Sequence, residues 1–169
     1  MKIVVRVLSL TALVTVGGCL GLGKPAQIEG VAVQAVDDGL VLKMSVPQRN
    51  YARGQSVPVT LVAENTTSAD ISIRADSGAL VSVSLWRQGE AGWQHVKTFP
   101  SAAVMIPTTW ILPAGKARTF TMDLPVTPDW PMAEYLRLEG RLNGRPCAAP
   151  AVMIQAWNTP EQCQREETY

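Results

Sequence analysis

The sequence predicts an all-β protein, an antiparallel β-sandwich that follows an N-terminal signal peptide, and three observations support this prediction. From Ile28 onward, apolar and polar residues alternate in short runs, which is the period of a strand with one buried face. Gly, Pro, Asn and Asp residues separate these runs at roughly 10-residue intervals, as turns do in a sandwich. No stretch after residue 27 keeps a helical period, and the 12 prolines would interrupt long helices.

The first part of the domain is expected to form six strands joined by recognisable turns. Asp37-Asp38-Gly39 reads as a tight hairpin turn. Residues 66–70 read as a polar turn, and residues 88–92 as a hairpin loop. The strands that these turns separate are expected at 31–36, 40–46, 57–65, 71–73, 81–86 and 93–99.

The second part continues the same pattern after the longest candidate loop, residues 100–113. Residues 102–106 of that loop look as much like a short buried strand as an exposed segment. The turn 113–116 leads into a strand at 119–124, and the turn Asn143-Gly144 separates the strands 136–142 and 151–157. We therefore expect one sandwich domain over residues 28–157 and a C-terminal tail over 158–169.

The N-terminus has the organisation of a secretory signal peptide. Lys2 and Arg6 precede an apolar run over residues 7–16 that is too short for a transmembrane helix, which needs about 20 residues. The following Val16-Gly17-Gly18-Cys19 resembles a bacterial lipobox. The resemblance implies that residues 1–18 are removed and that Cys19 is lipidated, with residues 19–27 as a short spacer to the domain. An ordinary secretory signal with a chance cysteine is the alternative.

This resemblance also implies a location in the cell envelope, attached to a membrane through the lipid on Cys19. Leu20 follows the cysteine where an aspartate resembles an inner-membrane retention signal, so the outer membrane is favoured over the inner one. Two or three acyl chains give stable anchoring, at about 0.8 kcal/mol for each buried CH₂ group.

The charge balance argues against nucleic acid as a partner. The chain has 15 basic and 14 acidic residues, and loss of Lys2 and Arg6 leaves 13 basic against 14 acidic. A DNA- or RNA-binding domain needs a basic excess gathered on one face. A net charge near zero also gives no polybasic support for membrane attachment.

The sequence contains three cysteines, so lipidation of Cys19 would leave two that can pair with each other. Cys147 and Cys163 would be exported to a compartment that permits disulfides, so we expect them to be linked. The bridge would tie the tail back to the edge of the sandwich. Free thiols and an intermolecular bond are the alternatives.

A family resemblance runs through turns and inward-facing positions between residues 51 and 142. The positions are Tyr51, Gly54, Val57, Val59, Leu61, Glu64-Asn65-Thr66-Thr67, Ser77-Gly78, Val81, Val83, Gly92-Trp93, Phe99, and Leu112-Pro113-Ala114-Gly115 followed by Phe120. On these residues the stretch resembles the BsuPI-type intracellular proteinase-inhibitor domain. The resemblance implies an immunoglobulin-like antiparallel sandwich and inhibition of proteinases.

The sequence offers little chemistry for catalysis, for a metal or for a cofactor. His95 is the single histidine, so any Ser-His or Cys-His site would have to use it. No Gly-x-Ser-x-Gly elbow and no glycine-rich phosphate loop is present in the domain. We therefore expect no enzyme activity, no metal site and no cofactor.

Tryptophans are the most suggestive binding residues. Trp86 falls on the outward parity of its strand, beside Trp93, whereas Trp110 and Trp130 lie in loop-like segments flanked by prolines. Aromatic residues are enriched at interface hot spots, so these four are candidate contacts for a protein partner. The alternative is that most of them plug the ends of the sandwich.

Three functions remain in competition. The first is a non-catalytic, lipid-anchored binding or scaffold module that acts through a protein partner in the envelope. The second is a proteinase inhibitor of the BsuPI type, for which 100–113 is the candidate inhibitory loop. The third, an enzyme, has the least support.

Overall fold

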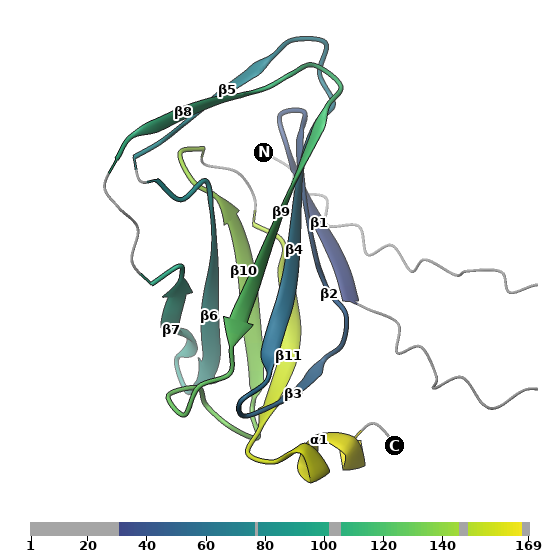
Figure 1. Ribbon diagram of the computed structural model, residues 1–169, viewed down its shortest axis with the longest axis vertical. Coiled ribbons are helices and arrows are strands. Elements are labelled where there is room, and N and C mark those ends of the chain that lie inside the picture. The colour runs from purple at the N-terminus through teal and green to yellow at the C-terminus, as the bar shows by residue number, and fades with distance from the viewer. Residues whose placement is uncertain (1–30, 77, 102–105, 146–148, 167–169) are drawn as a thin grey trace, which may run out of the picture.

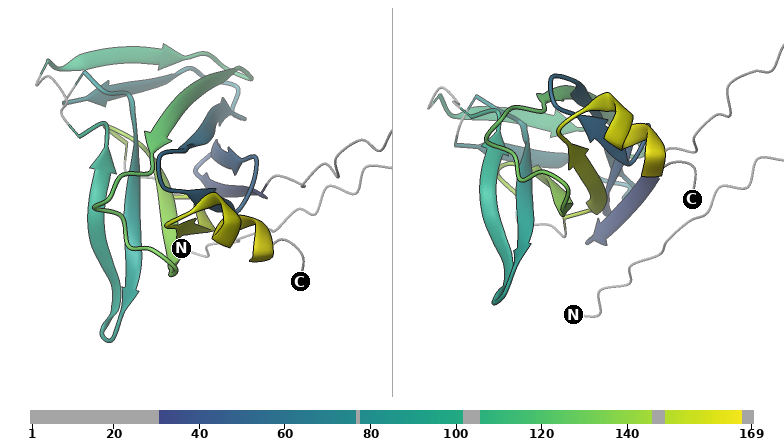
Figure 2. Two further views of the ribbon diagram at one scale, coloured as in Figure 1. Left: turned by 60° about the horizontal axis from the view of Figure 1, so that its bottom comes forward. Right: turned by 90° about the horizontal axis from the view of Figure 1, so that it is seen from below.

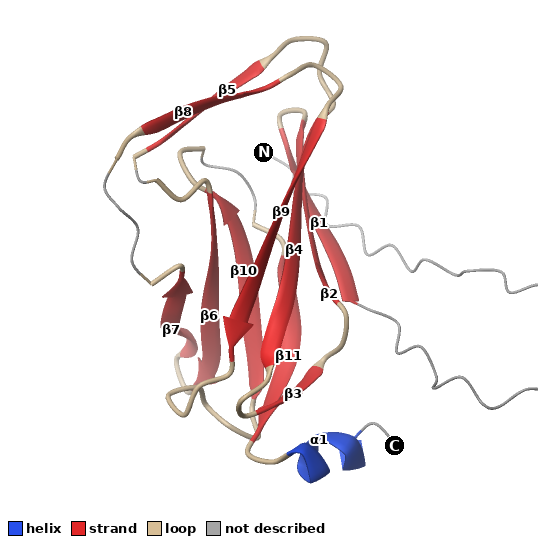
Figure 3. Cartoon of the chain, viewed as in Figure 1, coloured by secondary structure: helices blue, strands red, loops and turns tan. Residues whose placement is uncertain are grey.

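The computed structural model describes residues 31–76, 78–101, 106–145 and 149–166, and in them two β-sheets pack face to face (Figure 1). A two-stranded ribbon lies across one end of the sandwich. Figure 3 shows that strands make up nearly all of the regular structure. The predicted all-β sandwich is confirmed. The signal peptide 1–18, Cys19 and the spacer 19–27 lie outside the described residues and stay predictions.

The first sheet has four strands in the order β1-β2-β4-β9, all antiparallel. Asp38 and Gly39 form the predicted hairpin turn between β1 and β2, both with positive φ (45° and 77°), as a type I′ turn requires. The strands are β1 (Val31–Asp37), β2 (Leu40–Val46), β4 (Ser56–Asn65) and β9 (Ala117–Pro125).

The second sheet has five strands in the order β3-β11-β10-β6-β7. Its pairs are antiparallel except that β3 runs parallel to β11. Figure 2 shows the β6–β7 hairpin projecting beyond the body of the sandwich. The strands are β3 (Asn50–Ala52), β6 (Val81–Gly89), β7 (Gly92–Phe99), β10 (Tyr135–Leu142) and β11 (Ala151–Trp157).

The core lies between the two sheets and is built from alternate residues of each strand. Leu61 of β4 and Met44 of β2 face Gly140 of β10. A Cβ at Gly140 would lie 2.5 Å from Leu61 Cδ2, so the missing side chain lets the two sheets approach closely here. Burial of these apolar faces supplies the main driving force for folding.

The ribbon consists of β5 (Ile71–Ala75) and β8 (Thr108–Leu112). Trp110 and Leu112 alternate with exposed neighbours and bury one face of the ribbon. This corrects the prediction of a loop over 100–113, because its second half is a strand. Residues 102–105 of that segment lie outside the described residues.

The tail begins with a helix that the sequence pattern does not predict, α1 (Pro160–Glu166). It packs beside β3 and β11, and Cys163 on this helix is buried at 7% exposure. Cys147 lies outside the described residues, so its link to Cys163 stays a prediction.

Candidate functional site

The candidate site is the surface of the five-stranded sheet that points away from the core, here called the outer face. Along β10 the residues alternate, so that Leu136 and Leu138 enter the core while Arg137 and Glu139 point outward. The outer face comprises Ser82, Ser84, Trp86, Trp93, His95, Thr98, Tyr135, Arg137, Glu139, Arg141 and Met153.

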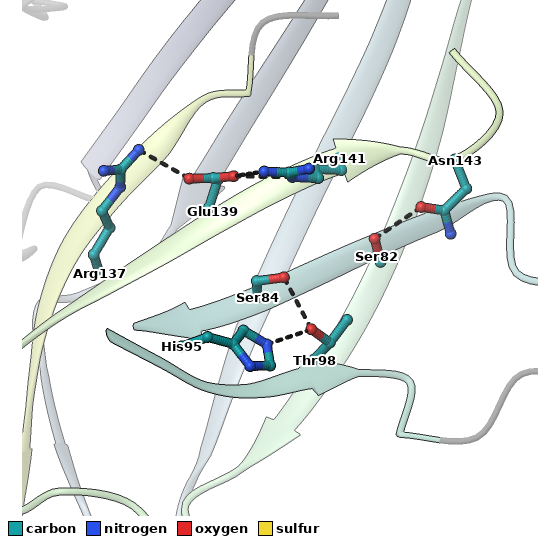
Figure 4. Close-up of polar contacts among 8 residues, drawn as sticks. All are labelled: Ser82, Ser84, His95, Thr98, Arg137, Glu139, Arg141 and Asn143. Atoms are coloured by element: carbon teal, nitrogen blue, oxygen red, sulfur yellow. Dashed lines mark hydrogen bonds and ion pairs between the residues drawn. The ribbon is translucent and has the colours of Figure 1, made fainter. Parts of the chain in front are cut away.

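Glu139 is the electrostatic centre of the outer face (Figure 4). Its side chain is only 8% exposed. Glu139 Oε2 forms an ion pair with Arg137 Nη2 at 2.9 Å, and Glu139 Oε1 forms another with Arg141 Nη2 at 2.6 Å. Arg141 Nε donates a further hydrogen bond to Glu139 Oε1 at 2.9 Å. A carboxylate withdrawn from water needs such compensation, since an unpaired buried charge is costly. The pairing therefore fixes both arginine side chains on the sheet surface.

A chain of hydroxyl and imidazole groups runs beside this triad. Ser84 Oγ lies 3.0 Å from Thr98 Oγ1, and Thr98 Oγ1 lies 2.8 Å from His95 Nε2 (Figure 4). A hydroxyl next to an imidazole is one half of a nucleophile–base arrangement, which also needs a group that orients the base. Among the described residues no carboxylate contacts His95. The hydrogen-bonded chain orients the imidazole on the surface of β7.

Trp86 and Trp93 lie on the outer face, each half buried, which confirms the outward parity expected for Trp86. The Trp86 ring meets His95 edge to face, with centroids 5.2 Å apart. The Arg137 guanidinium lies over the Trp93 ring, 5.9 Å from its centroid. Arg137 joins Trp93 to the Glu139 triad, and Trp86 lies opposite Arg137 in the β6–β10 ladder, so two tryptophans and two arginines lie together on the outer face.

Trp110 and Trp130 do not lie on this surface, because both side chains are buried in the sandwich, and their contact with a partner stays a prediction. Trp130 is 2% exposed and packs against Phe99 with ring centroids 6.0 Å apart. Trp110 is 7% exposed and meets Phe120 at 5.9 Å. Both rings fill space in the core, because the segments that carry them fold back over the sandwich ends.

A shallow hollow of about 370 Å³ lies at the tip of the β6–β7 hairpin. Arg87, Gln94 and Glu134 are among its lining residues, and Arg87 Nε donates a hydrogen bond to Gln94 Oε1 at 3.1 Å. Its lining is mostly polar and it sits next to the outer face.

Within the described part of the chain, no group of three His, Cys, Asp or Glu side chains is arranged to hold a metal ion.

Comparison with known proteins supports the fold and nothing finer. No family model matches the chain, and no curated protein matches it. Among solved structures, Spo0M, a sporulation control protein from Bacillus subtilis, matches 73% of this chain and 51% of its own, with a TM-score of 0.50 and 11% identity. The chain thus spans about half the length of that Spo0M structure. At this identity the likeness shows a shared β-rich fold.

Two glycosidases also match, each over a small share of its length. A β-glucosidase from Listeria innocua has a TM-score of 0.43 at 14% identity, with 71% of this chain and 16% of the enzyme covered. A β-glucuronidase from Bacteroides uniformis has a TM-score of 0.37 at 13% identity, covering 66% and 12%. Likenesses this weak carry no functional argument.

None of the helices in the described residues has the length and apolar character needed to cross a bilayer.

Proposed function

We propose that this protein is a lipid-anchored, non-catalytic binding or scaffold module of the cell envelope that docks a protein partner through the outer face. The single observation that carries the proposal is the ordered cluster of Trp86, Trp93 and Arg137, tied to the buried Glu139. Tryptophan and arginine are the residue types that most often dominate the binding energy of protein interfaces.

The cluster is suited to binding because its side chains are already ordered. Immobilising a rotamer-rich side chain at an interface costs about 0.5–1.5 kcal/mol. Here Glu139 holds Arg137 and Arg141 in place, and Arg137 in turn covers Trp93. A partner would therefore meet arginine side chains that already have ion-pair partners on the sheet surface. Two arginines against one glutamate leave a positive surplus that favours an acidic rim on the partner.

The proposed anchor limits where the partner can be. From the lipid on Cys19 to the start of β1 at Val31 the chain can span about 40 Å when extended. The domain would therefore work close to the membrane surface, the outer membrane being favoured, and its partner would be membrane-proximal. This part of the proposal rests on the lipobox resemblance of Val16-Gly17-Gly18-Cys19.

The test is a native extraction of the full-length protein from the envelope, with its complexes resolved by size and identified by mass spectrometry. We expect a discrete complex that the Trp93→Ser, Tyr135→Ser variant loses. The matched control is Ile111→Ser on the ribbon, because Ile111 is 59% exposed and Tyr135 is 63% exposed. Loss of the complex in the control, or its persistence in the outer-face variant, would contradict the proposal.

Proteinase inhibition of the BsuPI type is the second proposal. It draws on the family resemblance and on Ile106, which is 60% exposed and lies just before β8. A substrate-like inhibitor buries about 800 Å² on its own side and presents a pre-organised loop. Stoichiometric inhibition of any enzyme in a panel of serine, cysteine and metalloproteases, abolished by Ile106→Asp, would promote this function over the binding module.

A further inference from the structure

We infer that the free edge of β1 pairs with β1 of a second copy of this chain, so that two four-stranded sheets join into one continuous sheet. The proposal rests on the exposed backbone and side chains of β1 and is independent of the outer face. Figure 1 shows β1 at one lateral side of the sandwich and β7 at the other.

The other edges of the two sheets carry features that discourage strand addition. Edge β3 has three residues. Edge β9 carries Arg118 and Asp123 and ends at Pro125. Short edges, charges and prolines are the devices that natural sheets use against edge-to-edge pairing.

Edge β7 is guarded in a further way. A bulge interrupts its ladder with β6 at Leu85/Trp86. Lys97 of β7 forms an ion pair with Asp129 at 3.0 Å, and hydrogen bonds from Thr127 and Lys97 lower the pKa of Asp129 below its usual value. A bulge and a lysine held against the body of the protein both hinder pairing along this edge.

Edge β1 has none of these features. It is seven residues long, reads Val-Ala-Val-Gln-Ala-Val-Asp, and carries no charge before its last residue, Asp37. Val36 is 47% exposed, and Ala32 is exposed as well. Among the described residues no strand other than β2 pairs with it. A long and mostly apolar edge, without a charge before its last residue, is the type of edge that accepts another strand.

The turn between β1 and β2 fixes which backbone groups are available. In a two-residue hairpin the flanking pair, here Asp37 and Leu40, is hydrogen-bonded, and the hydrogen-bonded pairs alternate from there. The N–H and C=O groups of Ala32, Gln34 and Val36 therefore point away from β2. These three residues present their backbone groups to the free edge.

An antiparallel pairing centred on Gln34 uses all of those groups and is self-complementary. Gln34 would pair with the partner's Gln34 on a two-fold axis, and Ala32 would pair with the partner's Val36. The outward side chains would then meet as small apolar pairs and as two amides, without opposed like charges. Isologous interfaces of this kind are the commonest in homo-oligomers. A second copy therefore fits this edge better than a charged peptide would.

The test measures the mass of the purified full chain in detergent by sedimentation, with bound detergent counted. We expect the unaltered chain to be a dimer. The Ala32→Lys, Val36→Lys variant and the Ala32→Glu, Val36→Glu variant should each dissociate at least tenfold more readily, because each places like charges opposite one another. Mixed together under two different tags, the two variants should re-form a one-to-one dimer, which a merely misfolded chain would not do.

The matched control is Thr119→Lys, Thr121→Lys on β9, which adds the same charge to exposed positions at the other edge of the same sheet. We expect this control to remain a dimer. A monomeric unaltered chain would overturn the proposal, as would lysine variants at β1 that stay dimeric or a mixed pair that fails to associate.

Discussion

Asn65 holds the end of β4, the following turn and the ribbon together. Its side chain is completely buried, and its Nδ2 donates hydrogen bonds to the carbonyls of Ala69 at 2.8 Å and Leu112 at 3.0 Å. Its Oδ1 accepts hydrogen bonds from Thr67 N at 2.9 Å and Thr67 Oγ1 at 2.7 Å. The motif Glu64-Asn65-Thr66-Thr67 in the family resemblance thus has a structural cause, since a buried amide with all its bonds made fixes one turn geometry.

Replacing Asn65 with alanine should therefore destabilise the fold strongly. The buried hydrogen bond to the Leu112 carbonyl and the part-buried bonds to Ala69 and Thr67 would be lost, and we expect a loss of about 2–4 kcal/mol in the free energy of unfolding. Asn158→Ala is the control, because Asn158 is exposed beyond the end of β11. Urea unfolding monitored by tryptophan fluorescence gives both values, and equal losses for the two variants would refute the role of Asn65.

Because Tyr51 is buried, we expect the stability of the folded protein to fall at alkaline pH. Burial raises the pKa of Tyr51 to about 12, against 10.0 ordinarily. Below pH 10 both the folded and the unfolded states hold the phenolic proton, so its stabilising effect is complete. As pH rises from 10 toward 12 only the unfolded state releases it, and stability should fall by up to about 1.4 kcal/mol per pH unit.

The Tyr51→Phe variant should lack this part of the alkaline decline. The measurement is the midpoint of urea unfolding for both proteins between pH 9 and pH 11.5. The difference between the two curves isolates Tyr51 from lysines and other tyrosines. If the urea midpoints of the two proteins fall in parallel with pH, the pKa of Tyr51 is the same in the folded and unfolded states, which would contradict this prediction.

Strand parity predicted some residue environments and missed others. It predicts an outward Trp86, as found. It does not show that two flanking arginines cover Glu139 on the same face. The nearby prolines predict a loop around Trp110, whereas Trp110 lies in β8. Burial in these cases depends on neighbours distant in the sequence, which a local pattern does not contain.

At the scale of elements, turn chemistry was the reliable signal. The strands bounded by Asp38-Gly39, by residues 66–70 and by Asn143-Gly144 all occur where they were expected. The elements that were missed are β3, β8 and α1, which have three, five and seven residues. Segments this short have little intrinsic preference for helix or strand, and they adopt these structures because tertiary contacts stabilise them.

Gly144 links the end of β10 to the ribbon. Its φ is +84°, and a Cβ there would overlap the carbonyl oxygen of Arg74 in β5. Gly54 has the same φ, but a Cβ at that position would meet no atom within 4 Å. Comparing alanine at the two sites therefore separates backbone strain from steric overlap.

We expect Gly54→Ala to cost about 1–2 kcal/mol, the usual cost of a left-handed alanine. Gly144→Ala should cost at least twice as much, because the backbone of β5 must also move. Thermal unfolding of both variants provides the comparison. Similar melting temperatures would mean that the ribbon can move away from residue 144 without loss of stability. The close approach of Gly144 to Arg74 would then not determine the position of the ribbon.

The tail provides the second test at this scale. If Cys147 and Cys163 are linked, non-reducing peptide mapping of protein from its native compartment should recover one bridged pair. The Cys147→Ala, Cys163→Ala variant should lose about 3 kcal/mol at most, since the bridge closes a loop of about 17 residues. Two freely alkylated thiols in native material would refute the link.

At the scale of the whole molecule, the two proposed surfaces are compatible. The outer face belongs to the five-stranded sheet, whereas the β1 edge belongs to the four-stranded one. A dimer formed through β1 would leave Trp86 and Trp93 of each copy available to a partner. The likeness to Spo0M shows the β-rich fold alone, because one fold can carry many functions.

In the proposed lipoprotein, attachment to the membrane would depend on Cys19 alone. The Cys19→Ser variant should fail to incorporate a clickable fatty-acid probe and should no longer partition with membranes, because no thiol is available for acylation. The unaltered chain serves as the positive control, and Cys163→Ser tests whether another cysteine can take the label. Labelling that persists in Cys19→Ser would end the lipoprotein interpretation.

Site-specific photo-crosslinking in living cells tests the central claim, that the outer face docks a protein partner, most directly. A photoreactive amino acid at position 135 lies on the outer face, and the same group at position 111 lies on the ribbon with similar exposure. The account predicts one adduct of constant mass from position 135, reduced by Trp93→Ser, and no adduct from position 111. No adduct at position 135, or the same adduct from both positions, would contradict it.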